Sequence, residues 1–364
     1  MEVIKLVNVD MIMAALSKVK EPELGRDLVT LGMIKDVSED NGKVKFTLEL
    51  TTPACPFVEE IESSARKAVE SLEGVTSLEM KSTHKVPSGK GSFQQDPLPG
   101  VKNMIAIASG KGGVGKSTVS VNLASALASL GAKVGLLDAD IYGPNIPVMM
   151  GVIEKPSVAD KKMTPPVSYD VKIMSLGFFY QDDTALVWRG PMVAGAIKQL
   201  LTDTVWGDLD YLIIDLPPGT GDASLTLAQV IPLSGVVIVT TPQDAALNIA
   251  TKALAMFRKL KVPILGIVEN MSYYVCPHCG SKDEPFGHGG GKEASKSLDV
   301  PFLGELPLEV ETRIAGDEGK PIVLRDPSSP MAKAFMDLAK ASAAQISISA
   351  IGRQGEMRES IKLD

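Results

Sequence analysis

Two short stretches of the sequence carry residues whose types and spacing predict chemistry. Residues 110–118 read Gly-Lys-Gly-Gly-Val-Gly-Lys-Ser-Thr, which fits the phosphate-binding pattern G-x-x-x-x-G-K-[ST]. Its glycines let successive backbone N–H groups converge on a polyphosphate, and the helix expected after it adds a partial positive charge. The second stretch contains Cys276 and Cys279, whose C-x-x-C spacing predicts redox or metal chemistry.

The first stretch predicts a site for ATP. We expect Lys116 to reach the β and γ phosphates and the Ser117 hydroxyl to bind Mg²⁺. The loop residues expected to contact the nucleotide are Gly110, Lys111, Gly112, Gly113, Val114, Gly115, Lys116, Ser117 and Thr118.

Three carboxylates and one amide follow other apolar runs. Asp138 and Asp140 follow one run and Asp215 ends another, so all three meet a ligand that binds outside the carboxyl ends of parallel strands. We predict Asp215 as the carboxylate near Mg²⁺. Asn270 is a predicted adenine contact, because Tyr273 stands where guanine recognition needs an aspartate. Helix capping is the alternative for Asp138, and capping or burial for Asn270.

The cysteine pair supplies half of a metal site. Cys276 and Cys279 can ligate one metal from the same side, whereas tetrahedral zinc and iron-sulfur clusters need four protein ligands. Two copies of the chain supply four thiolates, so the spacing is consistent with a cluster shared by a homodimer. Zinc bound together with His278 and His288, a redox dithiol and an idle pair are the alternatives.

The composition limits the classes of function. The chain has 364 residues, a net charge of −7 and a pI near 5.2, which argues against a broad nucleic-acid surface. No uninterrupted apolar run reaches the roughly 18 residues of a membrane span, and three cysteines are too few for a disulfide framework. We therefore predict a cytoplasmic protein with no nucleic-acid partner and no stable membrane association.

Buried strands that alternate with helices must position these residues. This alternation predicts an α/β fold, a doubly wound parallel-sheet P-loop NTPase preceded by a small α+β domain. The predicted strands are 44–50, 104–108, 134–137, 211–214, 235–239 and 264–268, and the predicted helices include 11–19, 58–72, 117–130 and 331–344. The predicted division is a small domain at 1–82, a flexible linker at 83–103, an ATPase domain at 104–345 and a tail at 346–364.

The phosphate loop resembles that of one group of ATPases. Residues 111–117 fit K-G-G-x-G-K-[ST], the pattern of the deviant P-loop ATPases that include MinD, ParA and the nitrogenase iron protein. This resemblance implies a nucleotide-bridged homodimer in which Lys111 touches phosphate on the other chain, and it implies that Asp140 positions the attacking water. The predicted catalytic residues are thus Lys111, Lys116 and Asp140.

Further motifs follow the phosphate loop in a fixed order, at residues 137–145, 188–192, 215–222, 269–272 and 276–280. In this order they resemble the Mrp/ApbC (NBP-like) iron-sulfur cluster carrier ATPases. The resemblance implies a [4Fe-4S] cluster held between two subunits by their C-x-x-C pairs, together with ATP hydrolysis and delivery of the cluster to apoproteins. Through residues 21–33 and 51–56, the first domain resembles a small iron-sulfur assembly domain, in which Cys55 either assists transfer or packs in the core.

The predicted function is a homodimeric ATPase that binds an iron-sulfur cluster on Cys276 and Cys279. It receives the cluster from an assembly scaffold and passes it to apo iron-sulfur proteins. ATP, Mg²⁺ and the cluster are the predicted cofactors. The alternatives are a MinD/ParA-like positioning switch that uses ATP as a timer, and a zinc-stabilised ATPase.

Overall fold

Two units make up the chain in the computed structural model, which describes residues 7–90, 96–141, 143–179, 190–219, 221–276 and 278–361. The first unit comprises Met1–Pro87 with Ala350–Asp364, and the second comprises Ser88–Ser349.

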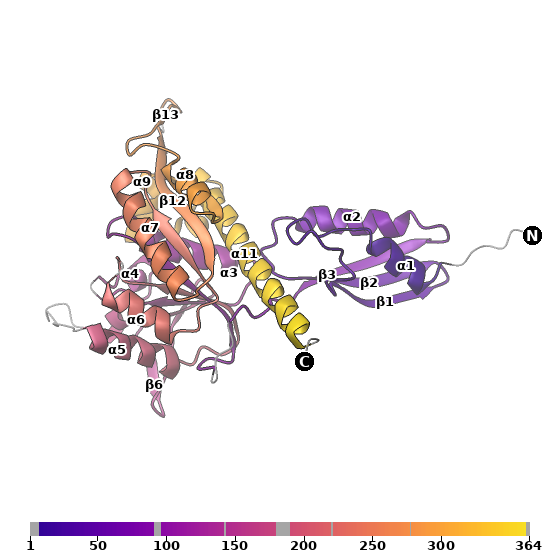
Figure 1. Cartoon of the computed structure of the whole chain (residues 1–364), viewed down its shortest axis with the longest axis horizontal. Helices are drawn as coiled ribbons and strands as arrows, with labels where there is room; N and C mark the ends of the chain where they lie inside the picture. The colour runs from indigo at the N-terminus through magenta and orange to yellow at the C-terminus, as the bar shows by residue number, and fades with distance from the viewer. Residues whose placement is uncertain are drawn as a thin grey trace, which may run out of the picture. The chain divides into compact units, whose positions relative to one another are not determined.

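The first unit has the predicted α+β character, with two helices and a three-stranded sheet of which only the central strand was expected (Figure 1). Its central strand buries every second side chain, and these apolar side chains pack with the buried face of the second helix in one core. The central strand pairs with one neighbour antiparallel and with the other parallel. The elements are α1 (Val9–Leu16), β1 (Ile34–Asp40), β2 (Lys43–Leu50), α2 (Val58–Glu70) and β3 (Ser77–His84).

The second unit contains a nine-stranded sheet in the order β13-β12-β11-β4-β10-β5-β9-β8, with β14 paired to β12. All neighbours are parallel except at β8 and β13, which pair antiparallel. The predicted doubly wound parallel sheet is therefore confirmed, with two short antiparallel strands added to it. Its strands are β4 (Val101–Ser109), β5 (Val134–Asp138), β8 (Val167–Ser168), β9 (Val171–Ser175), β10 (Leu209–Asp215), β11 (Gly235–Thr240), β12 (Ile264–Val275), β13 (Lys282–Asp283) and β14 (Phe302–Leu308).

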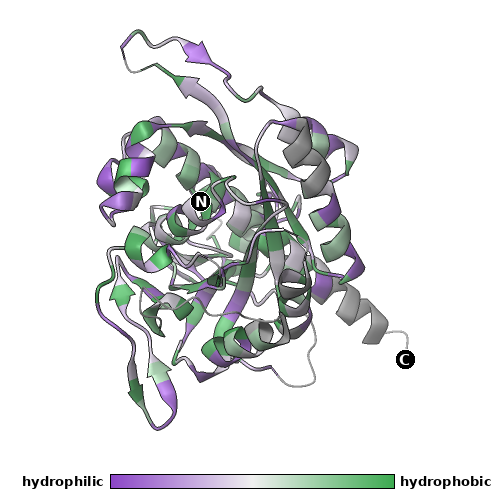
Figure 2. Ribbon diagram, turned by 90° about the vertical axis from the view of Figure 1, so that its left-hand side faces the viewer, coloured by the Kyte–Doolittle hydropathy of each residue, from purple (hydrophilic) through white to green (hydrophobic). Residues whose placement is uncertain are grey.

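The central strands of this sheet are apolar and fully buried, with helices around them (Figure 2). A hairpin of β6 (Ser157–Ala159) and β7 (Lys162–Thr164) and a 3₁₀ helix at Leu176–Phe179 complete the unit. None of the described helices combines the length and the apolar character that a membrane span requires. The helices are α3 (Lys116–Ser129), α4 (Ile146–Met149), α5 (Gly190–Asp203), α6 (Asp222–Val230), α7 (Asp244–Lys259), α8 (Gly290–Ser297), α9 (Val310–Asp317), α10 (Ile322–Arg325) and α11 (Pro330–Ile361), of which residues 330–349 belong to this unit.

Several element bounds differ from those expected. β4 begins at Val101, inside the segment predicted as a linker, and α11 continues well beyond 331–344. Before β4, the Gly89 N–H donates to Asn103 Oδ1 at 2.8 Å and the Lys90 ammonium lies 2.7 Å from Asp96 Oδ2. These contacts tie the described residues that precede β4 to the second unit.

Candidate functional site

The phosphate loop joins β4 to α3, and its backbone requires glycine at two described positions. Gly113 and Gly115 have φ values of 78° and 82°, which L side chains rarely adopt. A Cβ on Gly115 would also lie 2.2 Å from Asn270 Nδ2. This amide nitrogen donates to the Val114 carbonyl oxygen at 2.8 Å, so β12 holds the loop from one side.

A buried polar cluster lies at the start of α3. The Lys116 Nζ is 2.8 Å from Asp215 Oδ2 and 3.4 Å from Asp140 Oδ2. Asp215 also accepts from the Ser117 hydroxyl at 2.7 Å and from the Ser120 hydroxyl at 2.6 Å. The structure thus brings together Lys116, Ser117, Asp140 and Asp215, as their order along the chain predicts.

The donor and acceptor types of this cluster fit a nucleotide with Mg²⁺. The Lys116 ammonium is buried and, among the described residues, has no acceptor aligned for a hydrogen bond, as expected of a group that phosphate oxygens complete. The Ser117 hydroxyl and the Asp215 carboxylate offer the hard oxygen atoms that Mg²⁺ prefers, directly or through water.

Asp138 has a different position from that expected of a nucleotide contact. Its carboxylate accepts from the Asp140 N–H at 3.1 Å, the Ile146 N–H at 3.3 Å and the Ser175 hydroxyl at 3.0 Å. Burial, and then the charge of Asp215, raise the pKa of the Asp138 carboxyl to about 8, although the hydrogen bonds oppose this shift. These contacts place Asp138 behind Asp140, where it holds the backbone of that residue.

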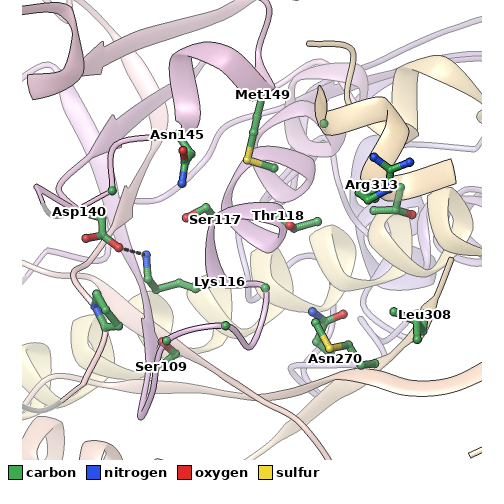
Figure 3. Close-up of a pocket in the computed structure, with 18 of the residues that line it drawn as sticks. Ser109, Lys116, Ser117, Thr118, Asp140, Asn145, Met149, Asn270, Leu308 and Arg313 are labelled. Atoms are coloured by element: carbon green, nitrogen blue, oxygen red, sulfur yellow. Dashed lines mark ion pairs between the residues drawn. The ribbon is translucent and has the colours of Figure 1, made fainter. Parts of the chain in front are cut away.

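A pocket of about 640 Å³ runs from this cluster to α9. Figure 3 shows Lys116 pointing toward Asp140 at one end, and Asn270, Leu308 and Arg313 at the other. Asn270 lines this pocket next to the phosphate loop, and its predicted contact with the base stays a prediction.

The sequence prediction missed the wall that β14 and α9 contribute. Thr312 lines the pocket at 8% exposure, and its hydroxyl has no hydrogen-bond partner among the described residues. Burial raises the pKa of the Glu309 carboxyl on the same wall. The sequence signal for this wall is weak, because Gly304 and Pro307 interrupt the apolar residues of β14, which ends at the same sheet edge as the phosphate loop. The lining residues missed are Pro307, Leu308, Glu309, Thr312, Arg313 and Met331, together with Met149, which lies next to Gly316 of α9.

Lys111 also lines the pocket, and its ammonium lies 3.2 Å from Gln243 Oε1. Its predicted contact with phosphate on another chain stays a prediction. The loop after Asp215 approaches the phosphate loop, because the Gly219 N–H donates to the Ser109 carbonyl oxygen at 2.9 Å. Thr220 in that loop and residues 188–189 of another motif lie outside the described residues, as does the side chain of Asp222.

The cysteine pair lies in the turn between β12 and β13. Tyr274 and Val275 of β12 pair with Asp283 and Lys282 of β13, and Figure 1 shows β13 at the far end of β12. The Cys276 N–H donates to the Ser281 carbonyl oxygen at 2.9 Å, which closes the turn.

Both thiols of the pair are accessible. Cys276 is half-buried, and Cys279 is exposed, with its Sγ 3.1 Å from Ser281 Oγ. Hydrogen bonds from Ser281, and then from Cys276, lower the pKa of the Cys279 thiol. Cys55 differs in each respect: it is 7% exposed in the core of the first unit, and burial raises the pKa of its thiol to about 11.

The histidines do not complete a metal site with the cysteines. His288 Nδ1 lies 2.9 Å from Ser272 Oγ and its Nε2 lies 3.8 Å from Glu305 Oε2. Within the described ranges, no three His, Cys, Asp or Glu side chains are placed to hold one metal ion. Among the residues that the structure describes, the two thiols therefore have no third ligand beside them.

Comparisons with known proteins agree over both units. The family model for the NUBPL iron-transfer P-loop NTPase matches residues 100–343, and that for iron-sulfur cluster assembly proteins matches residues 9–80. The iron-sulfur cluster carrier protein of Synechocystis sp. is 49% identical over 352 residues, 95% of this chain and 100% of that protein. The carrier protein of Escherichia coli K12 is 43% identical over 343 residues, 92% of each chain.

Two solved structures resemble the second unit. The nucleotide-binding protein of Archaeoglobus fulgidus in complex with ADP is 39% identical with a TM-score of 0.58, covering 66% of this chain and 94% of that chain. The cell division ATPase MinD of Pyrococcus furiosus is 25% identical with a TM-score of 0.50, covering 66% of this chain and 97% of that chain.

Proposed function

Because this chain belongs to the family of NUBPL iron-transfer P-loop NTPases, with an N-terminal domain of the iron-sulfur cluster assembly type, we propose that it carries an iron-sulfur cluster to apoproteins and hydrolyses ATP. The cluster is [4Fe-4S], and Cys276 and Cys279 of two copies hold it. The homodimer receives the cluster from an assembly scaffold and releases it to apo iron-sulfur proteins.

One observation carries this proposal: two accessible thiols lie side by side in the turn after β12, without a third ligand among the described residues of the same chain. A site for a cubane cluster needs four thiolates. A second copy related by a two-fold axis supplies the missing pair and leaves the cluster at the surface of each subunit, where another protein can remove it.

The nucleotide site supports the ATPase part of the proposal. Lys116 binds the β and γ phosphates in place of its two carboxylate partners, and Ser117 with Asp215 holds Mg²⁺. Bound Mg²⁺ offsets the charge of the phosphates. Asp140 lies at the phosphate end of the pocket and orients the attacking water, while Lys111 reaches phosphate on the other copy.

Anaerobic reconstitution with iron and sulfide tests the cluster site. The expected content is about four Fe per dimer, with the charge-transfer absorbance of an iron-sulfur cluster. Cys276→Ser is expected to remove both signals, whereas Cys55→Ala, which alters the third cysteine, should retain them. Iron content unchanged by Cys276→Ser would contradict the assignment, and stoichiometric zinc in protein purified without oxygen would favour a zinc-stabilised ATPase.

Sedimentation with ATP separates the proposal from a positioning switch. A switch of the MinD/ParA type is expected to bind anionic liposomes or DNA when ATP is present. We expect this chain to stay in the supernatant in both assays. ATP-dependent co-sedimentation without iron binding would replace the proposed function.

A further inference from the structure

Strand β12 takes part in both sites. Asn270 and Met271, in the middle of the strand, line the nucleotide pocket. Cys276 follows directly after the last residue of the same strand, Val275. One strand therefore leads from the nucleotide pocket to the turn that holds both cysteines.

Met271 interrupts the regular geometry of this strand. Its φ is 56°, a value that is costly for a side chain other than glycine, and the pairing of β12 with β14 shifts register between Asn270 and Tyr274. Of the described non-glycine residues with positive φ, Met271 alone lines the nucleotide pocket. Strained residues of this kind persist only where their surroundings fix them, and they concentrate at functional sites.

The residues before Met271 are fixed in two directions. The Asn270 amide donates to the Val114 carbonyl oxygen of the phosphate loop at 2.8 Å. The Glu269 carboxylate is fully buried and accepts from the Gly289 N–H at 3.0 Å and the Gly291 N–H at 2.5 Å, at the start of α8. The strand is thus anchored to the nucleotide site on one side and to a helix on the other.

Contacts continue from Met271 to the cysteine turn. The Ser272 hydroxyl donates to Glu269 Oε1 at 2.6 Å and lies 2.9 Å from His288 Nδ1. The Tyr273 ring meets the His288 ring edge to face, with centroids 6.4 Å apart, and the Lys282 ammonium lies 4.1 Å from the Tyr273 ring centroid. Lys282 pairs with Val275 across the hairpin, next to Cys276.

We propose that Met271 is a positioning residue that couples the nucleotide pocket to the cysteine pair. A nucleotide that contacts Asn270 and Met271 changes one of the supports that hold the strained backbone, and the change reaches the turn through Ser272, Tyr273 and Lys282. A nucleotide shifts the equilibrium between two arrangements of β12 and the cysteine turn by the difference between its affinities for them. The inference rests on the proposed function, because it assigns the nucleotide a role in how tightly the two cysteines bind the cluster.

The test is the alkylation rate of Cys276 and Cys279 in the full, metal-free chain, resolved from Cys55 by peptide mass spectrometry. In the wild type, saturating ADP is expected to change this rate by about fivefold or more. Met271→Gly accepts a positive φ without strain and is expected to reduce the ADP effect to less than about twofold, at an ADP concentration that saturates the variant by its own binding curve. Lys261→Gly is the matched control, because Lys261 has a φ of 57° but lies in the turn after α7.

Three results would overturn the coupling: an ADP-bound wild type with an unchanged rate, a full ADP effect in Met271→Gly, and an ADP effect that rises with protein concentration, which indicates burial between two copies. If Met271→Gly does not fold, Ser272→Ala answers the same question, since it removes the hydroxyl between Glu269 and His288. Iron binding at Cys276 that persists alongside any of these results leaves the proposed function standing and rejects only the coupling.

Discussion

The phosphate loop and the cysteine turn differ in how much of each site one chain supplies. At the loop, the side chain of Lys116 is 6% exposed and that of Asp215 is 1% exposed. Lys116 lies between Asp140 and Asp215, and Asp215 also accepts from Ser117 and Ser120 of α3. At the turn, Cys279 is exposed, and its thiol interacts with Ser281 and Cys276 of the same turn. The described residues of one chain therefore bring the phosphate-loop cluster together, whereas the proposed metal site would need ligands from a second copy.

This difference predicts which properties substitutions at each site should change. The groups at the loop are buried and charged, so their loss affects both folding and nucleotide binding. The thiols at the turn are accessible and carry little of the packing, so their loss should affect metal binding alone. Substitutions at each site therefore test whether stability and nucleotide binding vary independently of metal binding.

Lys116→Ala should have the largest effect. It removes the cation between Asp140 and Asp215, and a buried pair that loses one partner costs about 3–5 kcal/mol of unfolding free energy. ATP turnover should fall by about 100-fold or more, because the phosphates lose their main cation. Urea unfolding followed by tryptophan fluorescence measures the stability, since both tryptophans of the chain lie in the second unit.

Lys116→Arg keeps the charge and controls for stability. We expect it to recover most of the unfolding free energy but not the turnover, because the guanidinium differs in shape from the ammonium. Iron content after reconstitution should be equal in both variants and in the wild type. A loss of iron in Lys116→Arg would contradict the prediction that iron binding at the cysteine turn is independent of the phosphate loop.

Gly115→Ala should come next. The new Cβ would lie 2.2 Å from Asn270 Nδ2 at a φ of 82°, so the substitution strains the backbone and breaks the hydrogen bond to Val114. We expect a loss of about 2–4 kcal/mol in unfolding free energy. Gly112→Ala is the matched control, because a Cβ there meets nothing within 4 Å, and its stability should stay within about 0.5 kcal/mol of the wild type. Equal losses in the two variants would contradict the assignment.

The parts of the molecule that the sequence predicts well are those with local patterns. The phosphate loop is specified by nine consecutive residues, and the central strands by continuous apolar runs. The missed strands lack these signals. β1 and β3 expose most of their side chains, and β14 contains Gly304 and Pro307, which interrupt its apolar run.

Contacts between distant residues could not be predicted. The hydrogen bond from Asn270 to Val114 spans 156 positions, and the sequence gives no reason to expect that this amide holds the phosphate loop. For Asp138, its place at the end of a strand suggested a nucleotide contact, but the fold buries it behind Asp140. Sheet order and depth of burial decide such roles, and both are set by packing of the whole chain.

The buried Asp138 makes the stability of the second unit depend on pH. Its pKa is about 8 in the folded chain against 3.8 for an ordinary Asp, so the folded state binds the additional proton between these values. The unfolding free energy should therefore fall as pH rises from about 4 to about 8, with a slope of at most about 1.4 kcal/mol per pH unit from this group. Asp138→Asn should make the fall shallower, measured by urea unfolding at pH 6 and pH 8. A steeper fall in the variant would reverse the assigned direction.

The cysteines provide the smallest effects and the most direct comparison of accessible and buried positions. Cys55→Ala removes a buried sulfur from the core of the first unit and should cost about 1 kcal/mol of unfolding free energy, observed as a lower transition temperature for that unit by calorimetry. Cys279→Ala should leave every transition temperature unchanged, because the side chain is exposed in the turn. Iron content should follow the opposite order from stability: Cys279→Ala should lose the iron, and Cys55→Ala should keep it. A stable metal site in Cys279→Ala would show that at least one ligand is a residue other than the two cysteines. A second copy would then not be required to supply the missing ligands.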